Sequence, residues 1–533
     1  MVAVNRERLR QREQINSHLS RLKQRVFKKV VIERLLMVWA TLILLTHAFM
    51  VQHETDDLFI SLRYAQNLAT GLGPVFNVAE AVEGYTTPLW VFVLGTLARL
   101  GAPLLLTAKL LGLLGGMVTL WLLPQVARAW KWPGGMLATL LLALNTTFAV
   151  WTMAAMEMTL FSALLLAALW ALGTRRWSSS GFLFGLAVLT RPEGSFWLGI
   201  SLLWLLWHQR EARQVVWRPA AQILGAAALL VVPHELWRLA YYGEPLPNTF
   251  YNKVGLSSTM LRRGLDYLGA AAWDYRLALT PFLAVTPLIP ALWRKGGSLF
   301  FTLLLGQLAY VLIVGGDWMV AYRFLVPAVP LMLLLVARML CLAFNRMAND
   351  GKRLLAASAI LLFLALNLLT AVHWHTRLQP DWFFIQRWVP DGRLIAATVE
   401  TSCEPRTSLA VFAVGALGYY ALDYRIIDMF GLVTPEVNQT PGGVIGQGMA
   451  GHERFNAVAV RAMQPDLYVF HAELDQAPIQ SEAGWREGHL AHLIQQFTDD
   501  PTFWAEYGTR TLELEPGRYW NFVARHDAPC QWE

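Results

Sequence analysis

Long apolar runs fill this chain as far as residue 373, and they constrain its fold more than any other feature. About twelve follow one another, from residues 35–51 to residues 354–373, and several are shorter than the roughly 20 residues that a membrane-spanning helix needs. Because 55% of the 533 residues are hydrophobic and 15% are charged, the chain is too apolar for an ordinary soluble protein. The sequence therefore predicts a polytopic α-helical membrane protein, with short helices broken around a buried cavity.

Basic residues indicate sidedness, because cytoplasmic segments are enriched in Lys and Arg. The N-terminal arm, 1–32, is basic, and the first run is followed by His53 and Glu54 rather than by a small-residue cleavage site. We therefore expect a retained anchor with the arm in the cytoplasm. The loop 52–86 would then lie outside, which in a bacterium is the periplasm, with the protein in the inner membrane. Topology also accounts for the net charge of +7, so the charge does not predict a nucleic-acid partner.

The number of crossings follows from the two ends of the chain. A cytoplasmic N-terminus and an outer C-terminal domain require an odd number, so about 11 transmembrane helices are predicted over 33–375. One apolar run must then fail to cross. We expect a re-entrant or half-spanning helix between 87 and 155, where Arg128, Lys131 and Pro133 interrupt the pattern.

A change of composition beyond residue 373 predicts a soluble, mixed α/β extracytoplasmic domain over 376–533. Helices are expected within 451–463 and 490–497. Cys403 and Cys530 are the two cysteines of this domain, near its beginning and its end, and an oxidising compartment would allow them to pair. The predicted strands are 408–414, 424–429, 467–470, 511–514 and 519–524.

Two adjacent carboxylates, Asp56 and Asp57, follow the first apolar run directly. Thr55 can cap the helix that begins there, and apolar residues then recur at the spacing of one helical face, so we expect this helix to lie flat on the bilayer. One interpretation is that the pair only places negative charge in a first helical turn, where it meets the positive end of the helix dipole. The other is that the pair is catalytic.

Other short motifs follow the aspartates in a fixed order, and together they resemble the GT-C glycosyltransferases. Within that superfamily the chain most resembles the mycobacterial terminal β-arabinofuranosyltransferases, from the first apolar run to about Leu432. The resemblance implies an inverting transferase that moves a sugar, arabinofuranose, from a polyprenyl-phosphate donor to an extracytoplasmic glycan or glycoconjugate. The motifs are Asp56-Asp57 with Arg63-Tyr64, Glu83 to Trp90, Met156-Glu157, Thr190 to Gly194, Pro247 to Lys253, and Gly315 to Met319.

Roles for individual residues follow from this resemblance. One of the two aspartates is the general base; we favour Asp56, with Asp57 orienting it or the sugar, and repulsion within the pair would raise one pKa. Outward-facing cations would meet the donor phosphate, although arginines at helix ends also snorkel to the interface. The phosphate-binding candidates are Arg63, Arg191, Lys253 and Arg323, helped by His234 and Tyr251.

The remaining polar motif residues are candidates for binding sugar hydroxyls. An alternative is that the acidic ones pair with arginines, for instance Glu193 with Arg191, and that Asn248 only forms a turn. No metal-ligand spacing is present, so we expect no cofactor, although the aspartate pair could hold a divalent ion. The sugar-binding candidates are Tyr85, Glu157, Glu193, Asn248 and Asp317.

Two questions stay open at this point. Other sugars, such as a hexose or an aminopentose, would suit the same scaffold, and a transporter or flippase for a lipid-linked sugar would also be polytopic. Against a transporter, the acidic motifs cluster on one side and the chain has no internal repeat. We expect the C-terminal domain to shape the acceptor groove with aromatic residues such as Trp382, Tyr419, Tyr420, Trp504 and Trp520.

Overall fold

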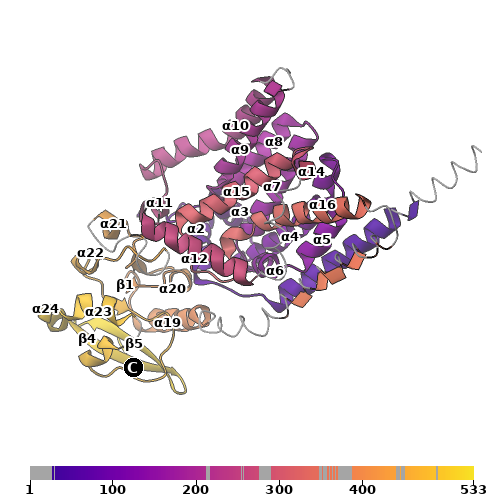
Figure 1. Cartoon of the computed structure of the whole chain (residues 1–533). Coiled ribbons are helices and arrows are strands. Elements are labelled where there is room, and N and C mark those ends of the chain that lie inside the picture. The colour runs from indigo at the N-terminus through magenta and orange to yellow at the C-terminus, as the bar shows by residue number, and fades with distance from the viewer. Residues whose placement is uncertain are drawn as a thin grey trace, which may run out of the picture.

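The computed structural model describes residues 27–28, 30–211, 217–253, 255, 257–274, 290–346, isolated positions between 351 and 372, 387–439, 445, 451–487 and 490–532. A bundle of helices precedes a sheet-containing part that begins at residue 387 (Figure 1). The predicted boundary at 375/376 lies outside the described residues. So do most of the N-terminal arm and most of the last apolar run.

The helical part contains five helices that are long and apolar enough to cross a membrane, and up to six if one bent pair counts as a span. That pair, α5 (Gly135–Ala143) and α6 (Thr146–Thr152), is bent by 67° and lies where a re-entrant or half-spanning helix was predicted. The total of 11 crossings stays a prediction. The five helices are Val30–Met50, α4 (Leu104–Ala129), α10 (Trp217–Tyr242), α15 (Gly297–Val314) and α16 (Ala328–Arg346).

Shorter elements complete this part. The apolar ones, α3, α7, α8 and α9, pack between the long helices. The other short elements lie in the connections. Their bounds are α2 (Asp56–Thr70), α3 (Pro88–Arg99), α7 (Met158–Gly173), α8 (Trp177–Thr190), α9 (Gly194–Glu211), α11 (Asn248–Lys253), α12 (Ser258–Asp274), α14 (Pro290–Trp293) and the 3₁₀ turn η2 (Arg323–Leu325).

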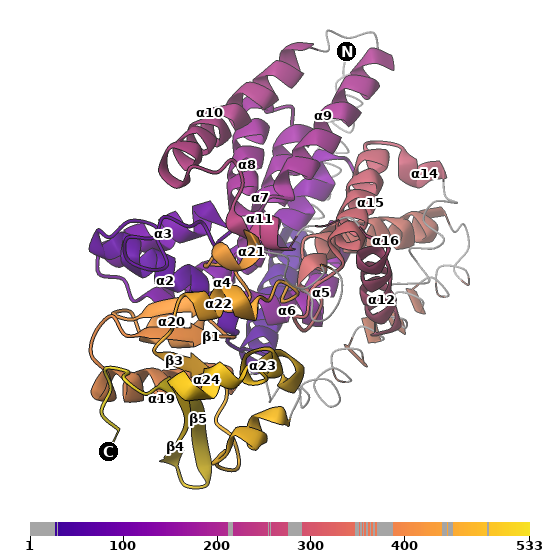
Figure 2. The same ribbon diagram turned by 90° about the vertical axis from the view of Figure 1, so that its left-hand side faces the viewer.

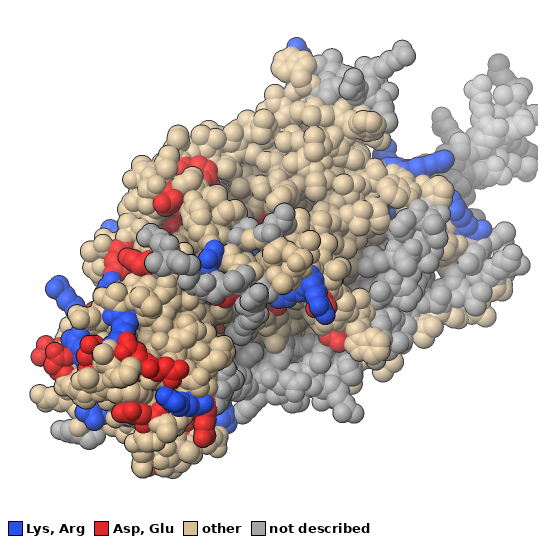
Figure 3. All heavy atoms as spheres, turned by 60° about the vertical axis from the view of Figure 1, so that its left-hand side comes forward, with Lys and Arg blue, Asp and Glu red and all other residues tan. Residues whose placement is uncertain are grey.

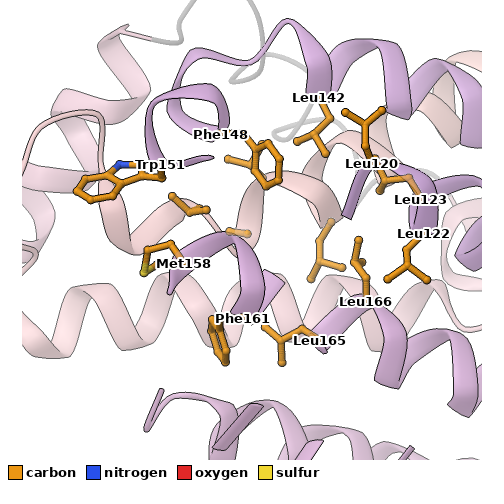
Figure 4. Packing of buried hydrophobic residues seen from close by; sticks show 14 of the residues in the cluster. Leu120, Leu122, Leu123, Leu142, Phe148, Trp151, Met158, Phe161, Leu165 and Leu166 are labelled. Carbon is orange, nitrogen blue, oxygen red and sulfur yellow. The ribbon is translucent and has the colours of Figure 1, made fainter. Parts of the chain in front are cut away.

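Close packing of α4 on α7 forms the centre of the bundle. A Cβ on Gly115 would lie 2.5 Å from the backbone nitrogen of Leu160, so the two helices approach too closely for any side chain there. Thr159 donates a hydrogen bond to the Gly112 carbonyl at 2.6 Å. Small residues commonly permit such approaches in membrane bundles. Figure 4 shows the buried side chains around this contact, among them Leu120, Leu122, Leu123, Leu142, Phe148, Phe161, Leu165 and Leu166.

Helix α2 is largely buried within the protein, and its predicted orientation along the bilayer stays a prediction. Nine of its 15 residues are buried, because it packs against α3 on one side and against α20 of the sheet-containing part on another. Thr55 stands at the N-cap position but makes no capping bond, and its hydroxyl donates instead to the Met156 sulfur at 3.7 Å. The helix that carries the aspartates is therefore an element between the two parts of the protein.

A five-stranded mixed sheet organises the C-terminal part, in the order β2-β1-β3-β5-β4. β1 pairs in parallel with β2 and β3, whereas β5 is antiparallel to β3 and β4. Every predicted strand is present, which confirms the mixed α/β domain. The strands are β1 (Ser408–Val411), β2 (Arg425–Asp428), β3 (Leu467–Val469), β4 (Tyr507–Glu515) and β5 (Arg518–Arg525).

Helices cover both faces of this sheet. Leu409 and Val411 face one layer, with α19, whereas Ala410 faces the other, as alternation along a strand requires. A disulfide joins Cys403, at the end of α19, to Cys530, beyond β5. The short elements of this part are α19 (Trp388–Ser402), α20 (Ala416–Tyr420), α21 (Glu436–Gln439), α22 (Ala457–Ala462), η5 (Glu482–Arg486), α23 (Ala491–Thr498) and α24 (Pro501–Glu506).

Charge separates the two parts on the face that Figure 3 shows. Acidic and basic side chains gather on the sheet-containing part at lower left, whereas most of the helical part is uncharged (Figure 3). An uncharged helical surface suits lipid, and a surface of mixed charge suits water. The fold is that of a multi-pass membrane protein with a polar C-terminal domain.

Candidate active site

Asp56 anchors the C-terminal domain to the helical part. One carboxylate oxygen accepts the backbone N–H of Gly415 at 2.8 Å and the other accepts that of Ala416 at 2.7 Å, at the start of α20. A carboxylate at a helix N-terminus satisfies unpaired N–H groups there. Burial raises the pKa of Asp56 to about 6, and this outweighs the two backbone hydrogen bonds, which act in the other direction.

Arg63 holds the opposite end of α20. Its guanidinium donates to the carbonyls of Gly418 and Ala421, the latter at 3.1 Å, and to that of Tyr424 at 2.9 Å. Nε also donates to the Phe76 carbonyl at 2.7 Å, and the side chain is buried. With its donors directed at protein carbonyls, Arg63 serves domain docking. It is not placed to bind a donor phosphate, as the sequence had suggested.

Asp56 binds just beyond the carboxyl end of β1, which pairs in parallel with β2 and β3. In the strand order β2-β1-β3, the chain leaves β1 and β3 in different directions, and ligands commonly bind beyond the carboxyl ends of such strands. A small cavity of about 10 Å³ lies there, between Ala413, His471 and Asp56. Figure 2 shows α20 directly beside α2. A side chain of the helical part thus occupies the space at the start of α20.

Asp57 faces a different environment from its neighbour. Its Oδ2 lies 3.8 Å from Nη1 of Arg323, and its side chain is 17% exposed. The same arginine donates through Nε to Asp317 at 2.8 Å. Asp57 thus has a partly accessible carboxylate beside a cation, whereas both carboxylate oxygens of Asp56 accept backbone N–H groups. Of the two aspartates, Asp57 is therefore better placed for proton abstraction.

Lys253 supplies a second cation at this position. It ends α11, and among the described residues no carboxylate lies within ion-pair distance of its ammonium group. Burial lowers the pKa of Lys253, whereas the negative charges of Asp57 and Asp428 act in the other direction and raise it. A Cβ on Gly451 would lie 3.3 Å from Nζ, so a glycine leaves room for this lysine against the C-terminal domain.

Asp428, to which sequence analysis gave no role, shapes the loop opposite Lys253. Its carboxylate accepts the backbone N–H groups of Phe430, Leu432 and Val433 at 2.8, 2.5 and 3.1 Å. Burial raises its pKa to about 6. An aspartate at the carboxyl end of a strand, followed closely by a glycine, is the sequence signal that could have identified it.

Asn248 and Asn252 of α11 bind the same loop from the helical side. Asn248 donates to the carbonyls of Gly431 and Leu432 at 2.8 and 2.7 Å, and Asn252 donates to that of Phe430 at 2.9 Å. The amide of Asn248, expected to bind sugar, is thus engaged by the backbone. These bonds fix α11, and with it Lys253, to the C-terminal domain.

Arg191, Glu157 and Glu193 form a buried ionic group, as one of the sequence interpretations held for Glu193. Arg191 bonds Glu157 through Nη1 and Glu193 through Nε, each at 2.5 Å. Its guanidinium lies 5.5 Å from the Phe324 ring centroid, and that of Arg323 lies 5.1 Å from the same ring. The group therefore supports the segment that carries Arg323, and among the described residues it forms no ion pair with Asp57.

The other three candidates lie in separate contacts. Tyr85 bonds the Tyr242 hydroxyl at 3.0 Å. His234 lies 3.5 Å from its neighbour Glu235 on α10. Tyr251 is 40% exposed and donates to Glu244 at 3.3 Å. None of these contacts connects them to Asp57, Arg323 or Lys253.

The aromatic residues expected to line an acceptor groove mostly have structural roles. Trp520 is 1% exposed in the domain core, and Tyr419 and Tyr420 pack on Phe59 of α2. Trp504 donates to the Thr498 carbonyl, and Trp382 lies outside the described residues. In the described part of the chain, no three His, Cys, Asp or Glu side chains are grouped as metal ligands.

The fold is that of a multi-pass membrane protein with known structural neighbours. The solved structure of ArnT from Cupriavidus metallidurans, bound to undecaprenyl phosphate, aligns with a TM-score of 0.53 over 76% of this chain and 88% of that one, at 13% identity. This similarity shows the fold alone. A family model described as a domain of unknown function (DUF8728) matches residues 368–518.

Two curated relatives make the similarity more specific. A terminal β-(1→2)-arabinofuranosyltransferase of Mycobacterium tuberculosis is 31% identical over 217 residues, which cover 36% of this chain and 34% of the relative. A protein of the same name from Corynebacterium glutamicum is 28% identical over 334 residues, or 52% of this chain and 47% of the relative. The matches span about a third to a half of the relatives' length. Over part of its length, the chain is thus similar to terminal arabinofuranosyltransferases.

Proposed function

We propose that this protein is an inverting glycosyltransferase that moves arabinofuranose from a polyprenyl phosphate to an extracytoplasmic glycan or glycoconjugate. The observation that carries the proposal is the placement of Asp57, a partly accessible carboxylate, beside Arg323 and Lys253 where the helical part meets the C-terminal domain. The names of the two curated relatives support the sugar.

The proposed chemistry assigns one role to each of these groups. Asp57 accepts the proton of the acceptor hydroxyl, and the hydroxyl oxygen attacks the anomeric carbon from the face opposite the phosphate. A new carbon–oxygen bond forms as the bond to the phosphate oxygen breaks, and the electron pair leaves with the polyprenyl phosphate. Arg323 and Lys253 neutralise the charge that develops on that phosphate. Attack from the opposite face inverts the anomeric configuration.

Asp56 has a positioning role in this proposal. Because both of its oxygens accept backbone N–H groups of the C-terminal domain, we assign proton abstraction to Asp57 rather than to Asp56, the residue first favoured. Asp56 begins α2 directly before Asp57, so docking of the domain fixes the backbone that carries the base. The cations on hand make a metal unnecessary in this scheme, and a chelator should leave turnover unchanged.

A transfer assay tests the proposal. Purified full-length protein in lipid nanodiscs is given polyprenyl-phosphate arabinofuranose, or the hexose or aminopentose analogue, with arabinofuranosyl oligosaccharide acceptors. We expect transfer from the first donor with inversion at the anomeric carbon. Asp57→Asn should lower turnover about 100-fold, the scale of a lost general base, whereas Asp499→Asn, at an exposed carboxylate of the C-terminal domain, should not.

Two results would reject the proposal. One is near-normal turnover by Asp57→Asn, which would show that Asp57 is not the general base. The other is no transfer from any donor by folded protein; flux of the labelled donor across proteoliposomes would then favour a transporter.

We infer in addition that the site faces the periplasm from the inner membrane of a bacterium. Basic N-terminal residues support this orientation, and so does the Cys403–Cys530 disulfide, because disulfides persist in oxidising compartments. Labelling of a cysteine introduced at the exposed position Val458 by an impermeant maleimide on intact spheroplasts tests it. Labelling only after lysis would place the domain in the cytoplasm.

A further inference from the structure

Basic residues gather at the end of the helical bundle that lies away from the proposed site. Lys109, near the start of α4, bonds Glu54 at 2.6 Å, close to the aspartate pair in the sequence. Arg128, near the other end of α4, bonds Glu33 at 3.1 Å, where the first membrane-spanning helix begins. Three helices end on this far side, and a basic residue follows each one: Lys131 after α4, Arg175 after α7 and Lys295 after α14.

These three residues adopt a backbone conformation that strains a side chain. Their φ values are 54°, 61° and 51°, in the left-handed region where glycine usually ends a helix. α10 and α15 end at the opposite side of the bundle, and each is followed by a glycine, Gly243 or Gly315, with φ 77°. A cytoplasmic location favours Lys and Arg anywhere in a connection, so it does not explain charge at these positions in particular. The charges therefore stand where the local backbone favours glycine.

The ends of α4, α7 and α14 meet at the indole ring of Trp130. A Cβ at Gly173, the last residue of α7, would lie 2.7 Å from Nε1 of this ring. A Cβ at Gly296, between α14 and α15, would lie 2.1 Å from the same indole. Only glycine allows the ring to lie so close to both connections. The basic residues within two positions of these contacts are Lys131, Arg175 and Lys295.

The charges of this group are exposed and have no counter-ion in the part of the chain that the structure describes. None of Lys131, Arg175 and Lys295 lies within ion-pair distance of a described carboxylate. Their exposed neighbours Arg176 and Arg294 also form no ion pair with a described residue. Like charges that gather in this way repel one another, and an anion bound between them removes that repulsion. The surface therefore suits an anionic ligand.

Tryptophan residues place this surface at the level of lipid headgroups. Trp130, Trp170 and Trp177 are partly exposed, and Trp293 is 40% exposed. The guanidinium of Arg176 lies 4.8 Å from the ring centroid of Trp170. Tryptophan is enriched where a membrane meets water, because its ring is apolar and its N–H reaches the headgroups. The anion available at this depth is the phosphate of a lipid.

We propose that Lys131, Arg175 and Lys295 form a binding site for the phosphate of an anionic phospholipid. The lipid belongs to the leaflet on the opposite side of the membrane from the proposed active site. Basic pockets between helices at a membrane surface bind such headgroups in other proteins. The site is separate from the proposed transfer reaction, and its test does not depend on turnover.

Thermal unfolding and native mass spectrometry of the full-length protein in neutral detergent test the proposal. Phosphatidylglycerol is the probe, and phosphatidylcholine, which carries a phosphate but no net charge, is the reference lipid. The test variant combines Lys131→Gly, Arg175→Gly and Lys295→Gly, because glycine suits the left-handed backbone and should allow folding. Arg128→Gln is the matched control, since it removes a charge at the same end of α4 that Glu33 already neutralises.

We expect phosphatidylglycerol to raise the unfolding temperature of the wild type and of Arg128→Gln, and to do so less at high salt. The triple variant should bind this lipid about 100-fold more weakly, because each cation near a membrane surface contributes about fivefold. Its unfolding temperature without lipid should be unchanged or higher, because backbone strain is relieved. If the side chains only capped the helix ends, the variant would be less stable without lipid and would keep its response to lipid.

Four other results would overturn the inference. Equal stabilisation by phosphatidylcholine would indicate general solvation of the helices, and an equal effect of inorganic phosphate would indicate a site for a soluble anion. Unchanged lipid binding by the triple variant would place the site elsewhere. No effect of phosphatidylglycerol on the wild type would leave these cations to water or to an acidic protein. If the triple variant is not recovered, the three single variants give the same comparison at about fivefold each.

Discussion

Asp56 and Arg63 hold opposite ends of the same five-residue helix. The carboxylate accepts N–H groups where α20 begins, and the guanidinium donates to carbonyls where it ends. The two residues lie two turns apart on α2, so a carboxylate meets the positive end of α20 and a cation meets its negative end. Docking of the C-terminal domain therefore depends on Asp56 and Arg63.

Any side chain at Gly415 should separate the domains. A Cβ there would lie 1.9 Å from the backbone carbonyl oxygen of Asp56. We expect Gly415→Ala to cost about 1–3 kcal/mol, the usual scale of overpacking, and to expose the amides of Gly415 and Ala416 to hydrogen exchange. Gly269→Ala, at a helical glycine with open space around it, is the control. Unchanged protection of the two amides in Gly415→Ala would contradict the docking geometry.

The pH dependence of thermal stability should report Asp56. Because burial raises its pKa to about 6, above the ordinary 3.8, the folded protein holds more protons than the unfolded chain between these values. The contribution of Asp56 to stability is therefore fully present below about pH 4 and is lost as the pH rises through about 6. The unfolding temperature should fall across that window.

Asp56→Asn isolates this contribution. Asp428 has the same direction of shift, so the decline should become shallower in the variant without vanishing. The amide also places a donor against a backbone donor, which should lower stability at every pH. Unfolding temperatures from pH 4 to pH 7 give the comparison, and parallel curves for the two proteins would show that Asp56 does not titrate in this range.

The Arg191 group should be structural. Arg191→Met leaves Glu157 and Glu193 buried without a counter-charge, and such a break costs about 3–5 kcal/mol. The triple variant Arg191→Met, Glu157→Gln, Glu193→Gln should recover most of that loss. If donor KM stays raised in the triple variant although its unfolding temperature recovers, Arg191 binds the donor phosphate after all.

Removing the disulfide should destabilise the C-terminal domain more than the site. Cys403 and Cys530 are 127 residues apart, and chain entropy gives about 5 kcal/mol as the upper scale for a loop of that length. We expect Cys403→Ser with Cys530→Ser to lower the unfolding temperature and to make it insensitive to reductant. Cys341→Ser, at the free cysteine, is the control. Two free thiols in mass spectra of protein from an oxidising compartment would contradict the bond.

Local sequence patterns predicted the elements well because they need only near neighbours. Alternation over a few residues identified every strand, and turn residues at Pro516 and Gly517 located the hairpin of β4 and β5. The bent pair α5 and α6 lies where interruptions of the apolar pattern indicated a half-spanning helix. Crossings over the residues that are not described cannot be read in this way.

Roles of single side chains depended on partners far along the chain. Asp56 and Arg63 were read as catalytic and phosphate-binding because their partners, more than 350 residues away, leave no trace in the local sequence. Pairing of each acidic candidate with an arginine was foreseen as an alternative, with Arg191 named for Glu193, two residues on, but not for Glu157. Glu193 and Asp317 each bond an arginine through one carboxylate oxygen.

The C-terminal domain is held at both ends of α20 by a helix encoded far upstream, α2. The family model that covers 368–518 omits α2, although α2 supplies the charges at both ends of α20. A C-terminal domain exchanged between relatives should therefore dock correctly only when the segment from Asp56 to Arg63 is exchanged together with it. The two segments should be inherited as a single unit despite the distance between them in the gene.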